Sequence, residues 1–200
     1  MSHRRGFRLG LFAATCLLAI PAAAAPPVKP SASHETGAMT LHLGNVDYLH
    51  RWSKEGQNEF TPKSDPDLAT WQDMVTINLF ENVTTGEQLA DVANRIVGNY
   101  QTNGKIIRTD AKPRTKDHPA EYLIVASLGD PAFLEAAFAR LLLHDGVGYA
   151  VVRSHRIYGK AAGPAMSEWL QQNGPAIETT LMNWSQVPAR DALKRLPQSK

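Results

Sequence analysis

The fold of this protein depends on the stretch FLEAAFARLLLHDGVGYAVVRSHRIY, residues 133–158. Its second half, 148–158, is rich in β-branched and aromatic residues, which are typical of strands. The first half, 133–143, has the Ala and Leu content of a helix, but we predict a strand there. Asp145-Gly146 between the halves is a turn signal of β-hairpins. The stretch therefore predicts two long antiparallel strands joined by a tight turn.

A two-residue turn would place His144 opposite Val147, and this register determines which side chains share a face. One face would carry small apolar side chains, as a helix-covered face requires: Leu143, Leu141, Ala139, Ala137, Ala150 and Val152. The other would mix arginine, aromatic and histidine side chains: His144, Leu142, Arg140, Phe138, Val147, Tyr149, Val151, Arg153 and His155. The second set suits an anionic or aromatic ligand, so we predict Arg140, Tyr149, Arg153 and His155 as ligand-binding residues. The alternative is an ordinary half-exposed sheet face.

The clearest helix in the sequence runs from Thr85 to Tyr100. Thr85 and Gln88 have the spacing of a capping box, which satisfies backbone N–H groups at a helix start. Apolar residues then recur on one helical stripe: Leu89, Val92, Ala93, Ile96, Val97 and Tyr100. Asn103-Gly104 is a typical helix end.

The remaining segments are shorter, and their patterns alternate between strand and turn. Strand patterns occur at 39–54, 74–80, 105–109 and 121–128. Between them, 60–66 is a turn-rich connection and 112–119 is a polar turn. Residues 65–71 suit one helical turn. After Gly159 the pattern becomes helical, and Asn173-Gly174-Pro175 is expected to end one helix and begin the next. A last amphipathic turn is expected over 189–196. This order predicts an α+β fold: a twisted antiparallel sheet with one long central helix and C-terminal helices packed on it.

The N-terminal segment has the three parts of a secretory signal peptide. Three arginines precede a run of 12 apolar residues, 9–20, and Pro21 and four alanines follow it. This run is too short for a bilayer span, which needs about 20 residues. We therefore expect residues 1–24 to be a signal peptide, 25–38 a flexible leader and 39–200 a single domain. Arg4-Arg5 also resembles a twin-arginine export signal, so both export routes stay open.

Removal of the signal changes the chemistry of the chain. Cys16, the only cysteine, would be lost, which excludes disulfides, thiolate metal sites and thiol nucleophiles. Three of the 21 basic residues would also be lost, leaving 18 against 19 acidic residues and a net charge of −1. This balance does not point to nucleic-acid or anionic-membrane binding. We expect a periplasmic or secreted protein with no membrane span after cleavage.

No sequence motif of catalysis, metal binding or cofactor binding is present. There is no Gly-x-Ser-x-Gly elbow and no Gly-rich phosphate loop. The histidines have no close spacing of the kind that metal ligands need, and His144 and His155 would lie about 26 Å apart along the hairpin. We therefore expect neither a metal nor a cofactor. Trp52 and Trp71 flank the turn-rich segment 56–62 and are the aromatic candidates for a site outside the hairpin.

Three segments resemble an uncharacterised family of exported proteobacterial proteins: LHLGNVDYLHRW (41–52), EFTP (59–62) and WQDMVTI (71–77). The order of elements over 40–185 also resembles the PsbP-like fold of photosystem extrinsic proteins and some bacterial envelope proteins. The resemblance to that fold is one of topology, and no residue roles are carried over from it. It implies non-catalytic binding or adaptor work.

Three functions are compatible with the sequence. The first is a binding or adaptor module whose ligand is a small molecule or a protein of the cell envelope. The second is an enzyme with a dispersed site built from His50, Asp47 or His155. The third is a structural or secretion-associated envelope protein with a protein partner.

Export predicts a shortened chain. When the protein is purified from the periplasm of the bacterium that makes it, its denatured mass should correspond to cleavage after Ala23 or Ala24, where small residues occupy the positions that signal peptidase reads. Mass spectrometry of the denatured protein measures this directly. A full-length mass in the cytoplasmic fraction would contradict the prediction.

Overall fold

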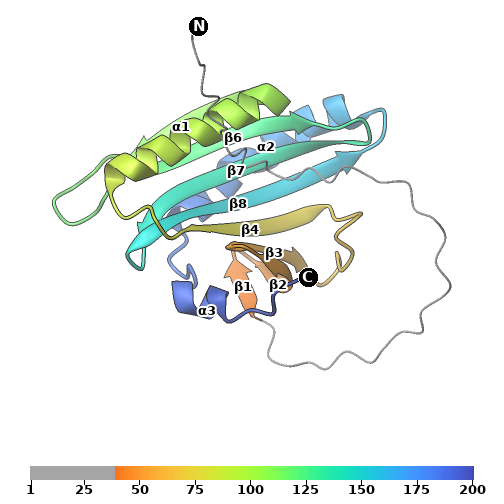
Figure 1. Ribbon diagram of the computed structural model, residues 1–200. Coiled ribbons are helices and arrows are strands. Elements are labelled where there is room, and N and C mark those ends of the chain that lie inside the picture. Colours follow the sequence, from red (N-terminus) through yellow and green to blue (C-terminus); the bar gives the residue numbers. More distant parts are fainter. Residues whose placement is uncertain (1–38) are drawn as a thin grey trace, which may run out of the picture. The chain divides into compact units, whose positions relative to one another are not determined.

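The computed structural model describes residues 39–200, so the expected signal peptide and leader lie outside the described residues (Figure 1). Its strands are β1 (Thr40–Leu43), β2 (Val46–Lys54), β3 (Gln57–Pro62), β4 (Asp73–Phe80), β5 (Gly104–Lys112), β6 (Glu121–Gly129), β7 (Phe133–His144) and β8 (Val147–Tyr158). Its helices are α1 (Gly86–Asn103), α2 (Ala162–Asn183) and α3 (Arg190–Lys194). None of these helices is long and apolar enough to span a membrane.

The strands form one antiparallel sheet in the order β1-β2-β3-β4-β8-β7-β6-β5. The hairpin β7–β8 has the predicted register, because His144 pairs with Val147 and His155 with Ala136. Asp145 and Gly146 both have positive φ, as a two-residue hairpin turn of this kind requires. The strand predicted over 133–143 is thus confirmed.

The face of small side chains is covered by a helix, as predicted, and this helix is α1. Its capping box is formed, with Thr85 and Gln88 each binding the other's backbone. The buried stripe of Leu89, Val92 and Ala93 packs in one cluster with residues of β6, β7 and β8: Ile124, Ala139, Leu141 and Ala150. Alanines at the sheet surface let the helix approach closely, because they leave room for its larger side chains.

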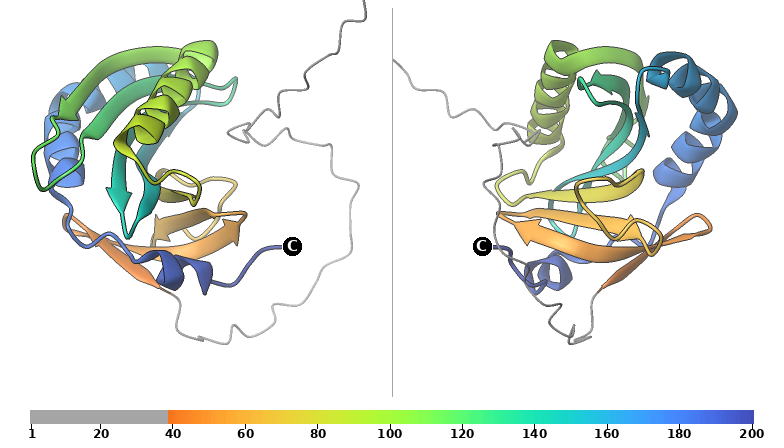
Figure 2. Two further views of the ribbon diagram at one scale, coloured as in Figure 1. Left: turned by 60° about the vertical axis from the view of Figure 1, so that its left-hand side comes forward. Right: turned by 90° about the vertical axis from the view of Figure 1, so that its right-hand side faces the viewer.

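The second face of the hairpin is also covered, although its mixed composition had suggested a surface open to ligands. Phe138, Leu142 and Val151 are buried in a cluster with residues from α2, the C-terminal segment and strands β1–β4. The main C-terminal contributors are Met166, Leu181, Trp184, Leu193 and Leu196. Figure 2 shows α1 and α2 on opposite sides of β5–β8. The sheet is therefore sandwiched between helices over this half.

The α+β class and the antiparallel sheet are confirmed, but the expected single long central helix is not found. The sheet dominates the described residues, and α2, with 22 residues, is longer than α1, with 18. The reason is that the predicted break at 173–175 does not occur: α2 continues through Pro175. Both ends of α2 are held by packing on the sheet, through Met166 and Leu181, and this packing outweighs the local stop signal.

The turn-rich reading of 60–66 was wrong at its start, because residues 57–62 form β3 between β2 and β4. The sequence pattern did not predict this strand because most of its residues are polar. The Asn58 side chain is buried and donates to the carbonyls of Gly56 and Ile77, so it replaces apolar packing with hydrogen bonds. The helical turn expected at 65–71 is a set of turns, in which the Asp65 carboxylate accepts the backbone N–H of Asp73.

Gly104, at the end of α1, is required by a close approach of two backbones. A Cβ at this position would lie 2.1 Å from the carbonyl oxygen of Ser127. We expect Gly104→Ala to lower the free energy of unfolding by about 1–3 kcal/mol, since a backbone atom cannot move aside cheaply. Gly98→Ala, within α1, meets nothing within 4 Å and should raise the free energy of unfolding by about 0.5–1 kcal/mol. Urea unfolding of both variants measures this, and equal stabilities would contradict it.

Candidate functional site

Arg140, one of the four residues predicted to bind a ligand, lies inside the protein and is only 6 % exposed. Its Nε donates to Glu121 Oε2 at 2.8 Å, and one terminal nitrogen donates to the carbonyls of Leu181 and Trp184 at 2.9 and 2.7 Å. These carbonyls belong to the C-terminal end of α2, where cationic donors are favoured. The Arg140 side chain thus joins the sheet to the end of α2, and the candidate site is built without it.

Tyr149, the second of these residues, is fully buried. Its hydroxyl donates to the carbonyl of Pro188 at 3.3 Å, and its ring meets the His144 ring edge-on at 5.2 Å between centroids. Burial raises the pKa of Tyr149 to about 12. The side chain therefore holds the C-terminal segment against the sheet.

Arg153 and His155 are brought together by a third residue, Asp73 of β4. Asp73 Oδ1 accepts from Arg153 at 2.6 Å and lies 2.8 Å from His155 Nδ1. Burial alone would raise the pKa of Asp73, but the hydrogen bonds and charges of these two partners outweigh it and hold that pKa below its usual value. His155 also stacks on Trp169 of α2, with ring centroids 4.0 Å apart. The three polar groups thus form one connected unit.

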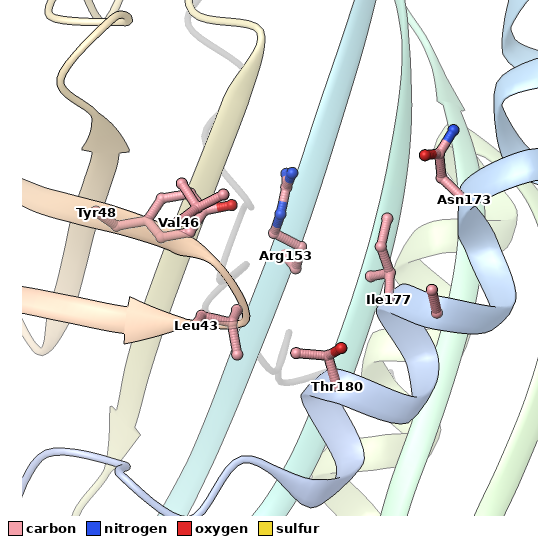
Figure 3. Close-up of a pocket in the computed structure, with 8 residues that line it drawn as sticks. Leu43, Val46, Tyr48, Arg153, Asn173, Ile177 and Thr180 are labelled. Carbon is pink, nitrogen blue, oxygen red and sulfur yellow. The ribbon is translucent and has the colours of Figure 1, made fainter.

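A hollow of about 170 Å³ lies beside this unit, between the β1–β2 turn and α2. Its walls are mostly apolar: Leu43, Val46, Tyr48, Ala176, Ile177 and the methyl group of Thr180, with Asn173 and Arg153 completing the lining (Figure 3). Val46 is 38 % exposed, and Ala176 and Thr180 are exposed as well. We call this hollow the groove. It is open to solvent at these three residues.

Of the residues that line the groove, the sequence pointed only to Arg153, and Tyr48 is among those that it missed. The Arg153 guanidinium carbon lies 5.5 Å from the centroid of the Tyr48 ring, and Figure 3 shows the hydroxyl directed toward Arg153. Tyr48 is only 1 % exposed, but its hydroxyl is not among the fully enclosed polar atoms of residues 39–200 that lack a partner, so it can be reached from the groove. Burial raises the pKa of Tyr48 to about 12. A neutral hydroxyl is therefore available as a donor at the groove.

Trp52 and Trp71, the aromatic candidates from the sequence, do not line the groove. Trp71 is buried, and the Arg156 guanidinium lies between its ring and that of Phe133, at 3.8 and 3.9 Å from the two centroids. Trp52 pairs with Glu59 of β3. Trp71 thus already has an intramolecular cation–π partner.

The residues of the alternative enzyme hypothesis each have a different partner. Asp47 binds His42 at 2.6 Å on the surface, and His155 binds Asp73. His50 Nε2 lies 2.7 Å from the hydroxyl of Ser53, which itself donates to Asn58 Oδ1. Because Ser53 gives its proton to Asn58, this Ser–His pair lacks the proton arrangement of a nucleophile and its base. Within residues 39–200 no group of three or more His, Cys, Asp or Glu side chains could hold a metal ion.

Comparison with known proteins gives no family for the chain. No family model matches it, and no curated protein matches it. Several solved structures are similar to it, and PA94 and Mog1p are two of them. PA94 from Pseudomonas aeruginosa, a protein of unknown function, has a TM-score of 0.43 and 13 % identity over 76 % of this chain and 99 % of its own. The Ran-binding protein Mog1p of Saccharomyces cerevisiae has a TM-score of 0.42 and 10 % identity over 73 % of this chain and 91 % of its own.

Arg140 provides a test of its role in the interior. Arg140→Ala should lower the free energy of unfolding by about 3–5 kcal/mol, because it leaves Glu121 and two helix-end carbonyls without their donor. Arg108→Ala is the control: Arg108 also forms ion pairs, but it is exposed, so its loss should change stability little. Urea unfolding compares the two. An Arg140→Ala variant as stable as Arg108→Ala would contradict this role.

Proposed function

We propose that this protein is a non-catalytic binding module whose groove receives an apolar side chain from a protein partner. The observation that carries the proposal is the groove itself: apolar walls from two elements, open to solvent on one side, with an arginine and a tyrosine hydroxyl at its lining. Its volume is below the range of about 300–1,000 Å³ that is usual for dedicated small-molecule sites. A single anchoring side chain fits this size better than a drug-sized ligand does.

The groove also has the placement of a binding hot spot. Anchoring side chains of protein interfaces bind in small desolvated pockets surrounded by contacts that exclude water. Here the groove is bordered by the exposed Val46 and by the exposed Ala176 and Thr180 of α2. These residues would form the surrounding contacts that exclude water. The walls are held by the core, since Leu43 and Tyr48 are buried in the main cluster. A preformed pocket loses little conformational entropy on binding.

We also propose that this binding takes place in the periplasm or outside the cell. The support is the signal-peptide pattern of residues 1–24. The partner would then be a small molecule or, as the size of the groove favours, a protein of the cell envelope. The denatured mass of the exported protein tests the location independently of the groove.

Filling the groove should abolish binding. In wild-type protein, N-acetyl-leucinamide should bind weakly, with a Kd on the order of 1 mM, and shift the methyl resonances of Leu43, Val46 and Ile177 in an NMR titration. Ala176→Trp should remove these shifts, because the indole occupies the groove, and should leave the melting temperature nearly unchanged because Ala176 is exposed.

The matched control is Gln171→Trp, which adds the same side chain at an exposed position of α2 outside the groove. This variant should bind the probe like wild-type protein. If the probe shifts methyl groups elsewhere, or if both tryptophan variants behave alike, the groove is not the binding site.

A further inference from the structure

We infer that the groove selects a chain end: an apolar C-terminal residue of a partner protein, with its free carboxylate bound by Arg153 and the Tyr48 hydroxyl. This inference rests on the proposed function and adds the chemistry of the partner. It starts from two polar groups in a hollow that is otherwise apolar. Apolar walls select a side chain, but they do not explain the presence of two donors beside it.

The Tyr48 hydroxyl is the stronger of the two observations. Among residues 39–200 the side-chain polar atom that is fully enclosed and lacks a partner is Arg190 Nε, so the Tyr48 hydroxyl is not enclosed and can be reached from the groove. Tyr48 is 1 % exposed, its hydroxyl has no partner among residues 39–200, and it is directed toward Arg153 at the groove (Figure 3). Since burial raises its pKa to about 12, the hydroxyl keeps its proton at neutral pH and can donate it to an acceptor. A ligand oxygen in the groove would be such an acceptor.

Arg153 supplies the positive charge. Its guanidinium has five N–H donors, and the structure shows bonds from its two terminal nitrogens, one to Asp73 and one to the carbonyl of Ser154. Donors therefore remain for a ligand. Asp73 balances part of the charge, but it also binds His155, so one carboxylate is shared between two basic side chains. The guanidinium is thus positioned by Asp73 without being fully occupied by it, and a carboxylate can take its remaining donors.

The size and opening of the groove favour a chain end over a free small acid. About 170 Å³ is enough for one apolar side chain and a carboxylate, while the exposed rim at Val46, Ala176 and Thr180 lets the preceding residues of a partner leave toward solvent. The preceding peptide would gain contacts along this rim, and a free small acid would lack them. Capture of a C-terminal carboxylate is an established mode of peptide recognition.

The test compares three probes by isothermal titration and NMR: acetyl-Gly-Gly-Leu with a free carboxylate, the same peptide as its C-terminal amide, and 4-methylpentanoate. Wild-type protein should bind the free-carboxylate peptide about tenfold or more tightly than the amide, because hydrogen bonds to a charged group are the stronger ones. It should also bind this peptide more tightly than 4-methylpentanoate, which lacks the peptide chain.

Two variants locate the carboxylate. Tyr48→Phe keeps the ring in the core cluster and removes only the hydroxyl, for which residues 39–200 provide no hydrogen-bond partner. It should therefore fold like wild-type protein and lose most of the tenfold preference while binding the amide unchanged. Arg153→Lys keeps a positive charge beside Asp73 but lacks the planar guanidinium, which can bind a carboxylate through two hydrogen bonds. This variant should therefore also reduce the preference for the free carboxylate. A preference that survives in both variants would overturn the inference, since the carboxylate would then be bound elsewhere.

The remaining outcomes separate the inference from the proposed function. Equal affinity for the two peptides, with shifts at the groove, would overturn carboxylate recognition and leave the apolar binding site in place. Equal affinity for 4-methylpentanoate and the free-carboxylate peptide would overturn the chain end as the occupant, because a small acid would suffice. Binding of none of the three probes would overturn both proposals.

Discussion

Strand β8 pairs along its length with β7 on one side and with β4 on the other, and the rest of the structure depends on this double pairing. The pairing with β4 joins the N-terminal strands β1–β4 to the C-terminal strands β5–β8 in one sheet. A slip of one residue would exchange the faces, moving Ala139 and Ala150 away from α1 and placing large side chains beneath that helix. The close fit of α1 on small residues therefore favours this register of β7 and β8.

The position of α2 follows from the opposite face of the same strands. Arg140 of β7 donates to the last carbonyls of α2, and Phe138 packs among residues of the same cluster as Met166 and Leu181. The half of α2 that ends at these carbonyls also carries Ala176, Ile177 and Thr180, which form one wall of the groove. A residue that seemed suited to ligand binding thus contributes indirectly, because it fixes the wall against which a ligand would lie.

The groove joins elements that are far apart in the chain through a short series of polar contacts. Tyr48 of β2 faces Arg153 of β8, Arg153 binds Asp73 of β4, and Asp73 binds His155, which stacks on Trp169 of α2. Each charge in this series has a partner, which limits the cost of burying it. The series holds Arg153 in place, so the donors it offers to the groove are preorganised. Affinity would then come from the apolar walls and selectivity from the polar residues.

Local patterns in the sequence were sufficient for the hairpin register, the capping box of Thr85 and the expectation that some helix covers the small-residue face, because alternation, turn type and helical spacing act between near neighbours. They failed where packing outweighs local preference: Pro175 lies inside α2, and residues 57–62 form a strand whose buried Asn58 is satisfied by backbone carbonyls. Burial of Arg140 and Tyr149 was likewise decided by tertiary structure, since the sequence of a sheet face does not show what packs against it. The groove depends on the contact between Tyr48 and Arg153, which lie more than a hundred residues apart in the chain and meet only when β4 joins β3 to β8.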